Sequence, residues 1–148
     1  MEKALDLALF AKREGNLPIG ALIVLDGEVI AQGCNTMLIP DYHPGRHAEM
    51  EALKHLPAKL WPQAAAMTCY TTLEPCTMCF GALLLHGIGR VVFGARDKQG
   101  GASVLMPHLP PYYKHKNRVF KWDGPIMPEV CDPLYEHALL MFRKLQAE

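Results

Sequence analysis

Residues 67–79 have the sequence MTCYTTLEPCTMC, in which a run of β-forming residues passes directly into the start of a helix. The run from Met67 to Thr72 predicts a strand. Pro75 favours the first turn of a helix, which we expect to continue to His86 and to end at Gly87. This strand–helix unit is the centre from which the rest of the fold can be predicted.

The segments on either side also alternate between strands and helices. We expect helices over 2–14, 47–56 and 133–145, and strands over 19–25, 29–31, 90–93 and 118–122. The dipeptide Asp26-Gly27 is a hairpin signal. The segments 36–46, 57–65 and 95–111 are expected to be loops, and each of them contains Pro or Gly. The order predicts an α/β fold, a three-layer α-β-α sandwich with a central mixed five-stranded sheet.

Composition limits the class of protein. At 148 residues we expect a single domain, 1–148. No apolar stretch approaches the roughly 20 residues that span a membrane, and the first residues lack a secretory signal, so we expect a cytoplasmic protein. Fifteen basic and fifteen acidic side chains cancel, which makes nucleic acid a less expected partner. Cys34, Cys69 and Cys131 lie in apolar surroundings, which fits free thiols in a reducing compartment.

Two cysteines in the motif Pro75-Cys76-Thr77-Met78-Cys79 are one helical turn apart, so both thiolates can reach one ion. His47 lies twenty-nine residues earlier. One imidazole and two thiolates suit Zn2+, and three protein ligands leave a fourth position for water, which zinc makes acidic enough to supply hydroxide near neutral pH. A structural site with a fourth ligand, from Cys34, Cys69 or His86, remains an alternative.

Glu49 lies two residues after His47, where a carboxylate can move protons to and from a water on the metal. We interpret it as the catalytic acid and base. Glu51, by contrast, has the position of an ordinary surface carboxylate in the first turn of a helix.

These motifs, with Pro18-Ile19-Gly20-Ala21, Thr72–Cys76 and Gly89–Asp97, resemble the cytidine and deoxycytidylate deaminase superfamily, and most closely its tRNA adenosine deaminase and guanine and cytosine deaminase branch. The resemblance implies a zinc-dependent hydrolase acting on C–N bonds, with one zinc ion held by His47, Cys76 and Cys79. It also implies substrate contacts from Asn35 and Ala48, a structural role for Glu74, and a homodimer packed through the helix after Cys76.

The substrate is less defined by the sequence. The tRNA branch usually has Asp-Pro-Thr-Ala before the metal histidine, whereas this chain has His43-Pro44-Gly45-Arg46. That loop and the neutral charge favour a free nucleobase or nucleoside of the guanine, cytosine, cytidine or adenine type. Adenosine in a tRNA anticodon arm is the alternative, since the aromatic and basic residues from Tyr112 to Arg118 could hold RNA or form a solvated loop. A non-catalytic zinc-stabilised binding protein is a third possibility.

Overall fold

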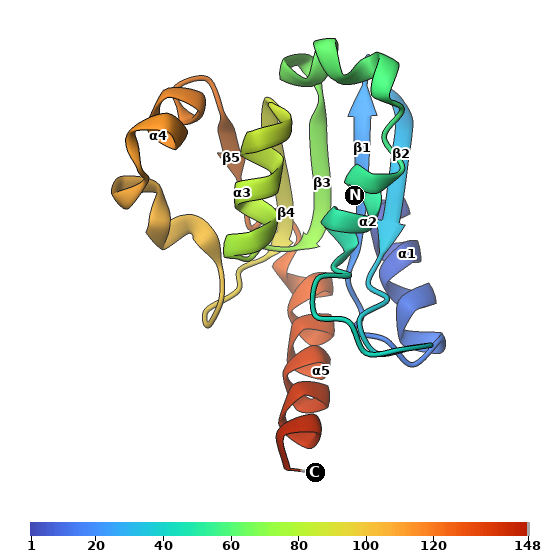
Figure 1. The fold of residues 1–148 in the computed structure, drawn as a ribbon. Helices are drawn as coiled ribbons and strands as arrows, with labels where there is room; N and C mark the ends of the chain where they lie inside the picture. Colours follow the sequence, from blue (N-terminus) through green and yellow to red (C-terminus); the bar gives the residue numbers. More distant parts are fainter. Residues whose placement is uncertain (148) are drawn as a thin grey trace.

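Five strands form one mixed sheet in a computed structural model that describes residues 1–147 (Figure 1). The strands are β1 (Gly20–Leu25), β2 (Glu28–Cys34), β3 (Thr68–Leu73), β4 (Arg90–Ala95) and β5 (Lys121–Asp123). Their order in the sheet is β2-β1-β3-β4-β5. The strand β1 is antiparallel to both of its neighbours, whereas β3, β4 and β5 run parallel. The prediction of a mixed five-stranded sheet is therefore confirmed.

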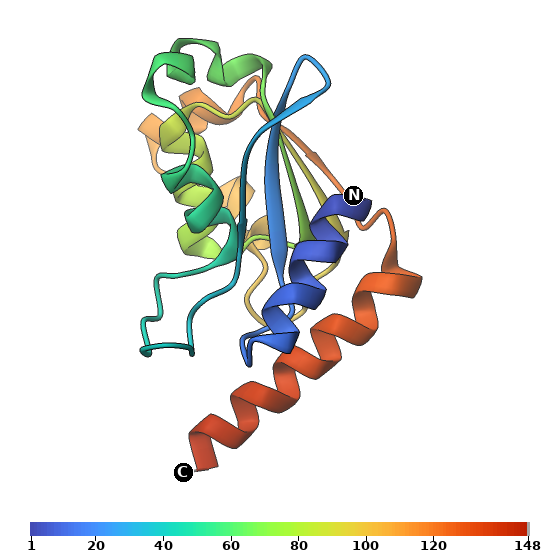
Figure 2. The same ribbon diagram turned by 90° about the vertical axis from the view of Figure 1, so that its right-hand side faces the viewer.

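Helices cover both faces of this sheet (Figure 2). One face carries α1 (Glu2–Arg13) and α5 (Pro128–Ala147), and the other carries α2 (Ala48–Lys54) and α3 (Thr77–His86). The C-terminal half of α5 extends beyond the end of the sheet in both views. The three-layer arrangement agrees with the predicted α-β-α sandwich.

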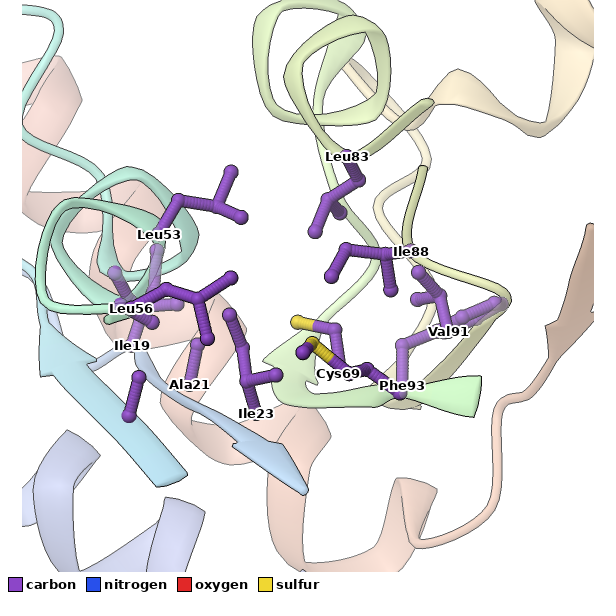
Figure 3. Close-up of a cluster of buried hydrophobic side chains, with 14 of the residues drawn as sticks. Ile19, Ala21, Ile23, Leu53, Leu56, Cys69, Leu83, Ile88, Val91 and Phe93 are labelled. Atoms are coloured by element: carbon purple, nitrogen blue, oxygen red, sulfur yellow. The ribbon is translucent and has the colours of Figure 1, made fainter. Parts of the chain in front are cut away.

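The main hydrophobic core lies between the sheet and the layer of α2 and α3 (Figure 3). Its labelled members in that view are Ile19, Ala21, Ile23, Leu53, Leu56, Cys69, Leu83, Ile88, Val91 and Phe93. Burial of each Leu, Ile, Val or Phe side chain in this group contributes roughly 1.5–3 kcal/mol, so this layer fixes the two helices firmly on the sheet.

Two glycines allow this packing. Gly33 lies on β2 where a Cβ atom would come within 2.5 Å of the backbone nitrogen of Ala52 on α2. Gly87 has a φ of +79° and ends α3 in the left-handed conformation, as the sequence predicts.

Differences from the predicted elements are concentrated in segments rich in proline. The segment expected as a loop after Leu56 contains a 3-10 helix, η1 (Ala58–Ala66), and a second, η2 (Ala102–His108), follows β4. A short helix, α4 (Pro111–Asn117), precedes β5. The last helix begins at Pro128, five residues earlier than predicted, because Pro128 and not Pro133 occupies its first turn.

In the part of the chain that the structure describes, none of the five cysteines forms a disulfide, and Cys69 and Cys131 are buried. Within residues 1–147, no helix has the length and apolar character needed to cross a membrane.

Candidate metal centre and active site

The three predicted metal ligands come together where two helices begin. His47 is the N-cap residue of α2, Cys76 is the N-cap residue of α3, and Cys79 lies in the first turn of α3. Neither N-cap side chain makes the hydrogen bond that usually caps a helix. The core shown in Figure 3 packs α2 and α3 side by side, and this brings residues 47 and 76 together.

The distances between these side chains fit a zinc ion. The Nδ1 atom of His47 lies 3.5 Å from Sγ of Cys76 and 3.6 Å from Sγ of Cys79. A tetrahedral zinc with the usual Zn–N and Zn–S bond lengths would separate such atoms by roughly 3.6 Å. Among residues 1–147, no fourth His, Cys, Asp or Glu joins this group of ligand atoms. Three protein ligands are the number that a catalytic zinc site uses, and the described residues offer no fourth ligand for the structural alternative.

The close packing of the two cysteines and the histidine shifts their pKa values. A hydrogen bond from Cys79 lowers the pKa of Cys76 to about 4, against the effect of burial. The same hydrogen bond, together with burial, raises the pKa of Cys79. The thiolate of Cys76 in turn raises the pKa of His47. The lowered pKa of Cys76 favours the thiolate, the form of cysteine that binds metals.

Glu49 is almost completely buried, with 3% of its surface exposed, beside the ligands. Its Oε1 atom accepts a hydrogen bond of 2.9 Å from the hydroxyl of Thr71, and Oε2 accepts one of 3.4 Å from the thiol of Cys79. Burial raises the pKa of this carboxyl group, although the bond from Thr71 opposes the rise. Such a carboxyl group is suited to both accept and donate protons near neutral pH.

The two predicted substrate-binding residues are also buried at this end of the sheet. Asn35 follows β2 and is 0% exposed. Its Oδ1 atom accepts a hydrogen bond from the backbone of Met37, while its Nδ2 atom has no partner among the described residues. Ala48 is the first residue of α2, and the first backbone N–H groups of a helix have no intrahelical acceptor. Both residues therefore offer donors for a ligand.

Glu74 has the structural role that the resemblance implies. Its carboxylate accepts hydrogen bonds from the backbone of Asp97, at 3.1 Å, and from the backbone and hydroxyl of Ser103. An isolated bridge also pairs Cys76 with Gly101. The buried carboxylate thus fastens the segment after β4 to the loop that carries the first thiolate.

A hollow of about 380 Å³ opens beside the metal ligands. It is lined by Ile19, His47, Leu73, Cys76, Asp97, Gln99, Gly100, Tyr135, Ala138, Leu139, Phe142, Arg143 and Gln146. The last six of these residues belong to α5, which therefore forms one wall of the hollow. This helix extends beyond the end of the sheet (Figure 1). A larger hollow of about 440 Å³ is also bordered by Tyr135 and Leu139, but none of the metal ligands lines it. The candidate active site is therefore identified by its ligand residues and not by the volume of the hollow.

The loop before the metal histidine closes on α2. Arg46 pairs with Glu51 at 3.0 Å, and Glu51 is only 8% exposed. The prediction of an ordinary surface carboxylate at Glu51 is therefore wrong, because the guanidinium group folds back over it. His43 is exposed, and its Nδ1 atom accepts a hydrogen bond from the backbone of Gly45.

The sequence did not predict two features near the site, Thr71 and the wall formed by α5. Threonine is common in strands, so nothing in the local sequence indicated that Thr71 would contact Glu49. The wall from α5 was expected only as an apolar helix face, which predicts core and not a ligand site. Tyr135 on this wall donates a 2.8 Å hydrogen bond to Asp97, and burial, with the nearby carboxylate of Asp97, raises the pKa of Tyr135 to about 12.

Known proteins are similar to this chain in both sequence and fold. Residues 1–95 match the family model described as the cytidine and deoxycytidylate deaminase zinc-binding region. A tRNA-specific adenosine deaminase of Bacillus subtilis is 42% identical over 113 residues, which cover 74% of this chain and 68% of that protein. A cytosine deaminase of Candida albicans is 43% identical over 98 residues, which cover 64% of this chain and 63% of that protein.

A solved structure from a study of A-to-I editing by tRNA:A34 deaminases has the same fold. It superposes with a TM-score of 0.70 at 34% identity, covering 84% of this chain and 95% of that one. The matched family region contains all three ligands of the metal centre. The chain thus belongs to the cytidine and deoxycytidylate deaminase family, and it is a zinc-dependent hydrolase that acts on C–N bonds.

Proposed function

We propose that this protein converts adenosine to inosine in RNA, with a tRNA anticodon arm as the expected substrate. The observation that carries the chemistry is the buried carboxylate of Glu49 beside the three-ligand cluster of His47, Cys76 and Cys79. The overall reaction consumes one water and releases one ammonia, with the exocyclic amine replaced by oxygen.

The metal ligands and Glu49 divide the work. The imidazole of His47 and the thiolates of Cys76 and Cys79 would hold the zinc ion, which when bound makes water acidic enough to act as hydroxide near neutral pH. Glu49 accepts a proton from the attacking water at Oε2, since Oε1 is held by Thr71. It delivers this proton to the ring nitrogen. It then carries the second proton, from the newly added hydroxyl group of the substrate, to the departing amine, so that ammonia leaves.

Asn35 and Ala48 position the base. The unpartnered amide of Asn35 and the free backbone donors at the start of α2 point to contacts with polar atoms of the substrate. A buried donor without a partner costs free energy in the empty protein, so a ligand that accepts from it binds more tightly.

Two observations support RNA as the substrate. Two relatives that are more than 30% identical to this chain are described as tRNA deaminases. They are the Bacillus subtilis protein and the protein in the solved structure of a tRNA:A34 deaminase. In addition, the hollow beside His47 and Cys76 extends along α5 to Arg143 and Gln146, which are exposed. A rim of this kind can accommodate nucleotides that flank the target.

A free nucleobase or nucleoside remains the second candidate substrate. It is supported by the identity to the Candida albicans cytosine deaminase and by the neutral charge of the chain. The pairing of Arg46 with Glu51 also leaves that arginine engaged within the protein and not with a phosphate. The non-catalytic reading is disfavoured by the lack of a fourth protein ligand within residues 1–147.

A direct assay separates the two substrate classes. Zinc-loaded protein is incubated with a panel of free bases and nucleosides, where ammonia release is measured, and with an anticodon-arm RNA, where inosine is detected by sequencing. We expect inosine in the RNA and little ammonia from the panel. Ammonia release from a free base, without inosine in the RNA, would refute the RNA proposal; Glu49→Gln is the inactive control in both arms.

We also propose a homodimer packed through α3. The outward face of this helix carries Met78 and Leu85, the latter 51% exposed, with Gly81 and Ala82 between them. These positions lie on one helical face, and none of them is charged. An apolar helix that is exposed on its outer side is typical of a surface that another copy covers.

A further inference from the structure

We infer that α4 and the turn after it, residues 111–121, form a second contact surface for RNA, separate from the zinc pocket. This inference rests on the proposed RNA substrate, and it adds a place for the strand beyond the target adenosine. The surface carries the aromatic and basic stretch from Tyr112 to Arg118, which takes no part in the metal centre.

Charge is the first argument. Five of the fifteen Lys and Arg residues lie between positions 98 and 122, a segment without a single Asp or Glu. The neutral chain thus consists of one strongly basic segment and an acidic remainder. Within residues 1–147, none of Lys114, Lys116 and Arg118 forms an ion pair. A cluster of uncompensated cations on one surface attracts a polyanion such as the RNA backbone.

The shape of the surface is the second argument. A hollow of about 370 Å³ is bordered by His115, Lys116 and Arg118. Its exposed apolar side chain is Val119, whereas Leu84 and Ile88, which also border it, are almost completely buried. Beside it, Tyr112 is largely exposed, and the ammonium group of Lys116 lies 5.4 Å from the centre of its ring. Apolar surface next to cations suits a nucleotide, whose base has two flat faces and whose phosphate is anionic.

The position of the surface predicts how long the RNA must be. The hollow is also lined by Gly87 and Gly89, at the C-terminal end of α3, whereas Cys76 begins that helix. The ten residues of α3 span about 15 Å at 1.5 Å per residue. At about 3.4 Å per nucleotide along a helical strand, the surface lies four to five nucleotides from the pocket.

The test compares two charge-matched triple variants. Lys114→Glu/Lys116→Glu/Arg118→Glu changes the proposed surface, and Lys12→Glu/Lys54→Glu/Lys59→Glu changes exposed lysines elsewhere. Binding of a fluorescein-labelled anticodon-arm hairpin is followed by anisotropy over a range of salt concentrations. Melting temperature and zinc content report whether each variant is folded, and a Met substitution of the same three basic residues repeats the test without adding negative charge.

We expect the first variant to bind the hairpin roughly tenfold or more weakly, with a log–log salt slope smaller by about two to three. The control should change binding much less. A single-stranded RNA of three nucleotides centred on the target, which is too short to reach the surface, should not distinguish wild type from the first variant. Equal loss of binding in both variants, or no binding by the wild type at low salt, would overturn the inference.

The outcomes also separate this surface from the proposed activity. If the wild type binds the hairpin through residues 111–121 but forms no inosine, the activity proposal fails and the surface stands. If the wild type forms inosine and the first variant binds RNA normally, the surface fails and the activity proposal stands.

Discussion

At the scale of single residues, Glu49 is the centre of the proposed chemistry. Glu49→Gln keeps the size of the side chain and its contact with Thr71 but removes the group that moves protons. Because Glu49 is not a member of the ligand cluster, zinc content should stay near one ion per chain while turnover falls by roughly 10²- to 10⁴-fold. Metal analysis and single-turnover deamination of the same sample would measure both, and full turnover in the metal-replete variant would refute the assignment.

Thr71 holds that carboxylate in place. It is completely buried on β3, and its hydroxyl donates to Oε1 of Glu49, which leaves Oε2 directed toward the side of Cys79. Thr71→Val preserves shape but removes a hydrogen bond to a buried carboxylate, which should lower kcat roughly tenfold with little change in KM. Thr71→Ser keeps the hydroxyl and should restore most of the rate; an equal loss in both variants would indicate a packing effect instead.

At the scale of elements, the distance between α2 and the sheet determines where His47 and Glu49 lie. Gly33→Ala would place a Cβ atom within 2.7 Å of the carbonyl oxygen of Ala48 and even closer to Ala52, so α2 must move away from β2. We expect a loss of about 1–3 kcal/mol of stability together with weaker zinc binding. Chemical denaturation and competition with a zinc chelator measure the two effects.

Gly27→Ala is the matched control for that variant. Gly27 lies in the β1–β2 turn with a φ of +82° and no atom within 4 Å of an added Cβ. It should lose about 1 kcal/mol from backbone strain and keep its zinc affinity. Loss of zinc affinity in both variants would show that general destabilisation, and not the position of α2, is responsible.

The elements that carry the site could be predicted because their signals are local. Pro75 and Gly87 mark the two ends of α3, Asp26-Gly27 marks the hairpin, and Cys76 and Cys79 lie one helical turn apart. His47 joined them in the prediction because the resemblance to a known family implies it. Other features depend on contacts between distant segments. The burial of Glu51 requires Arg46 to fold back, and Thr71 meets Glu49 only after β3 and α2 are packed together. The predicted start of the last helix was also wrong. Proline is favourable in the first turn of a helix, but Pro133 lies inside α5, which begins at Pro128.

At the scale of the whole molecule, the proposed dimer gives α3 a partner on its outer face. Leu85→Glu places a charge on that face and should convert a dimer to a monomer, because a buried charge without a partner costs several kcal/mol. Leu140→Glu is the control, since Leu140 has a similar exposure of 55% but lies on α5. Analytical ultracentrifugation at micromolar concentration gives the mass of each; a monomeric wild type would contradict the dimer.

The place of His47 and Cys76 at the first positions of two helices has a consequence for how this fold can change. A side chain at an N-cap position can either accept a hydrogen bond from its own helix or bind the ion. Neither His47 nor Cys76 caps its helix, so both side chains are available to the ion. Cys76→Ser should therefore have two effects. The serine hydroxyl can cap α3, which should add up to about 1 kcal/mol to the stability of the metal-free protein, and zinc binding should be lost. Thermal melts with and without zinc would show a variant that is more stable empty than the wild type and indifferent to the metal. Catalysis and helix stability thus compete for the same two positions, and a descendant of this chain that lost its metal could gain stability at the very residues that had bound it.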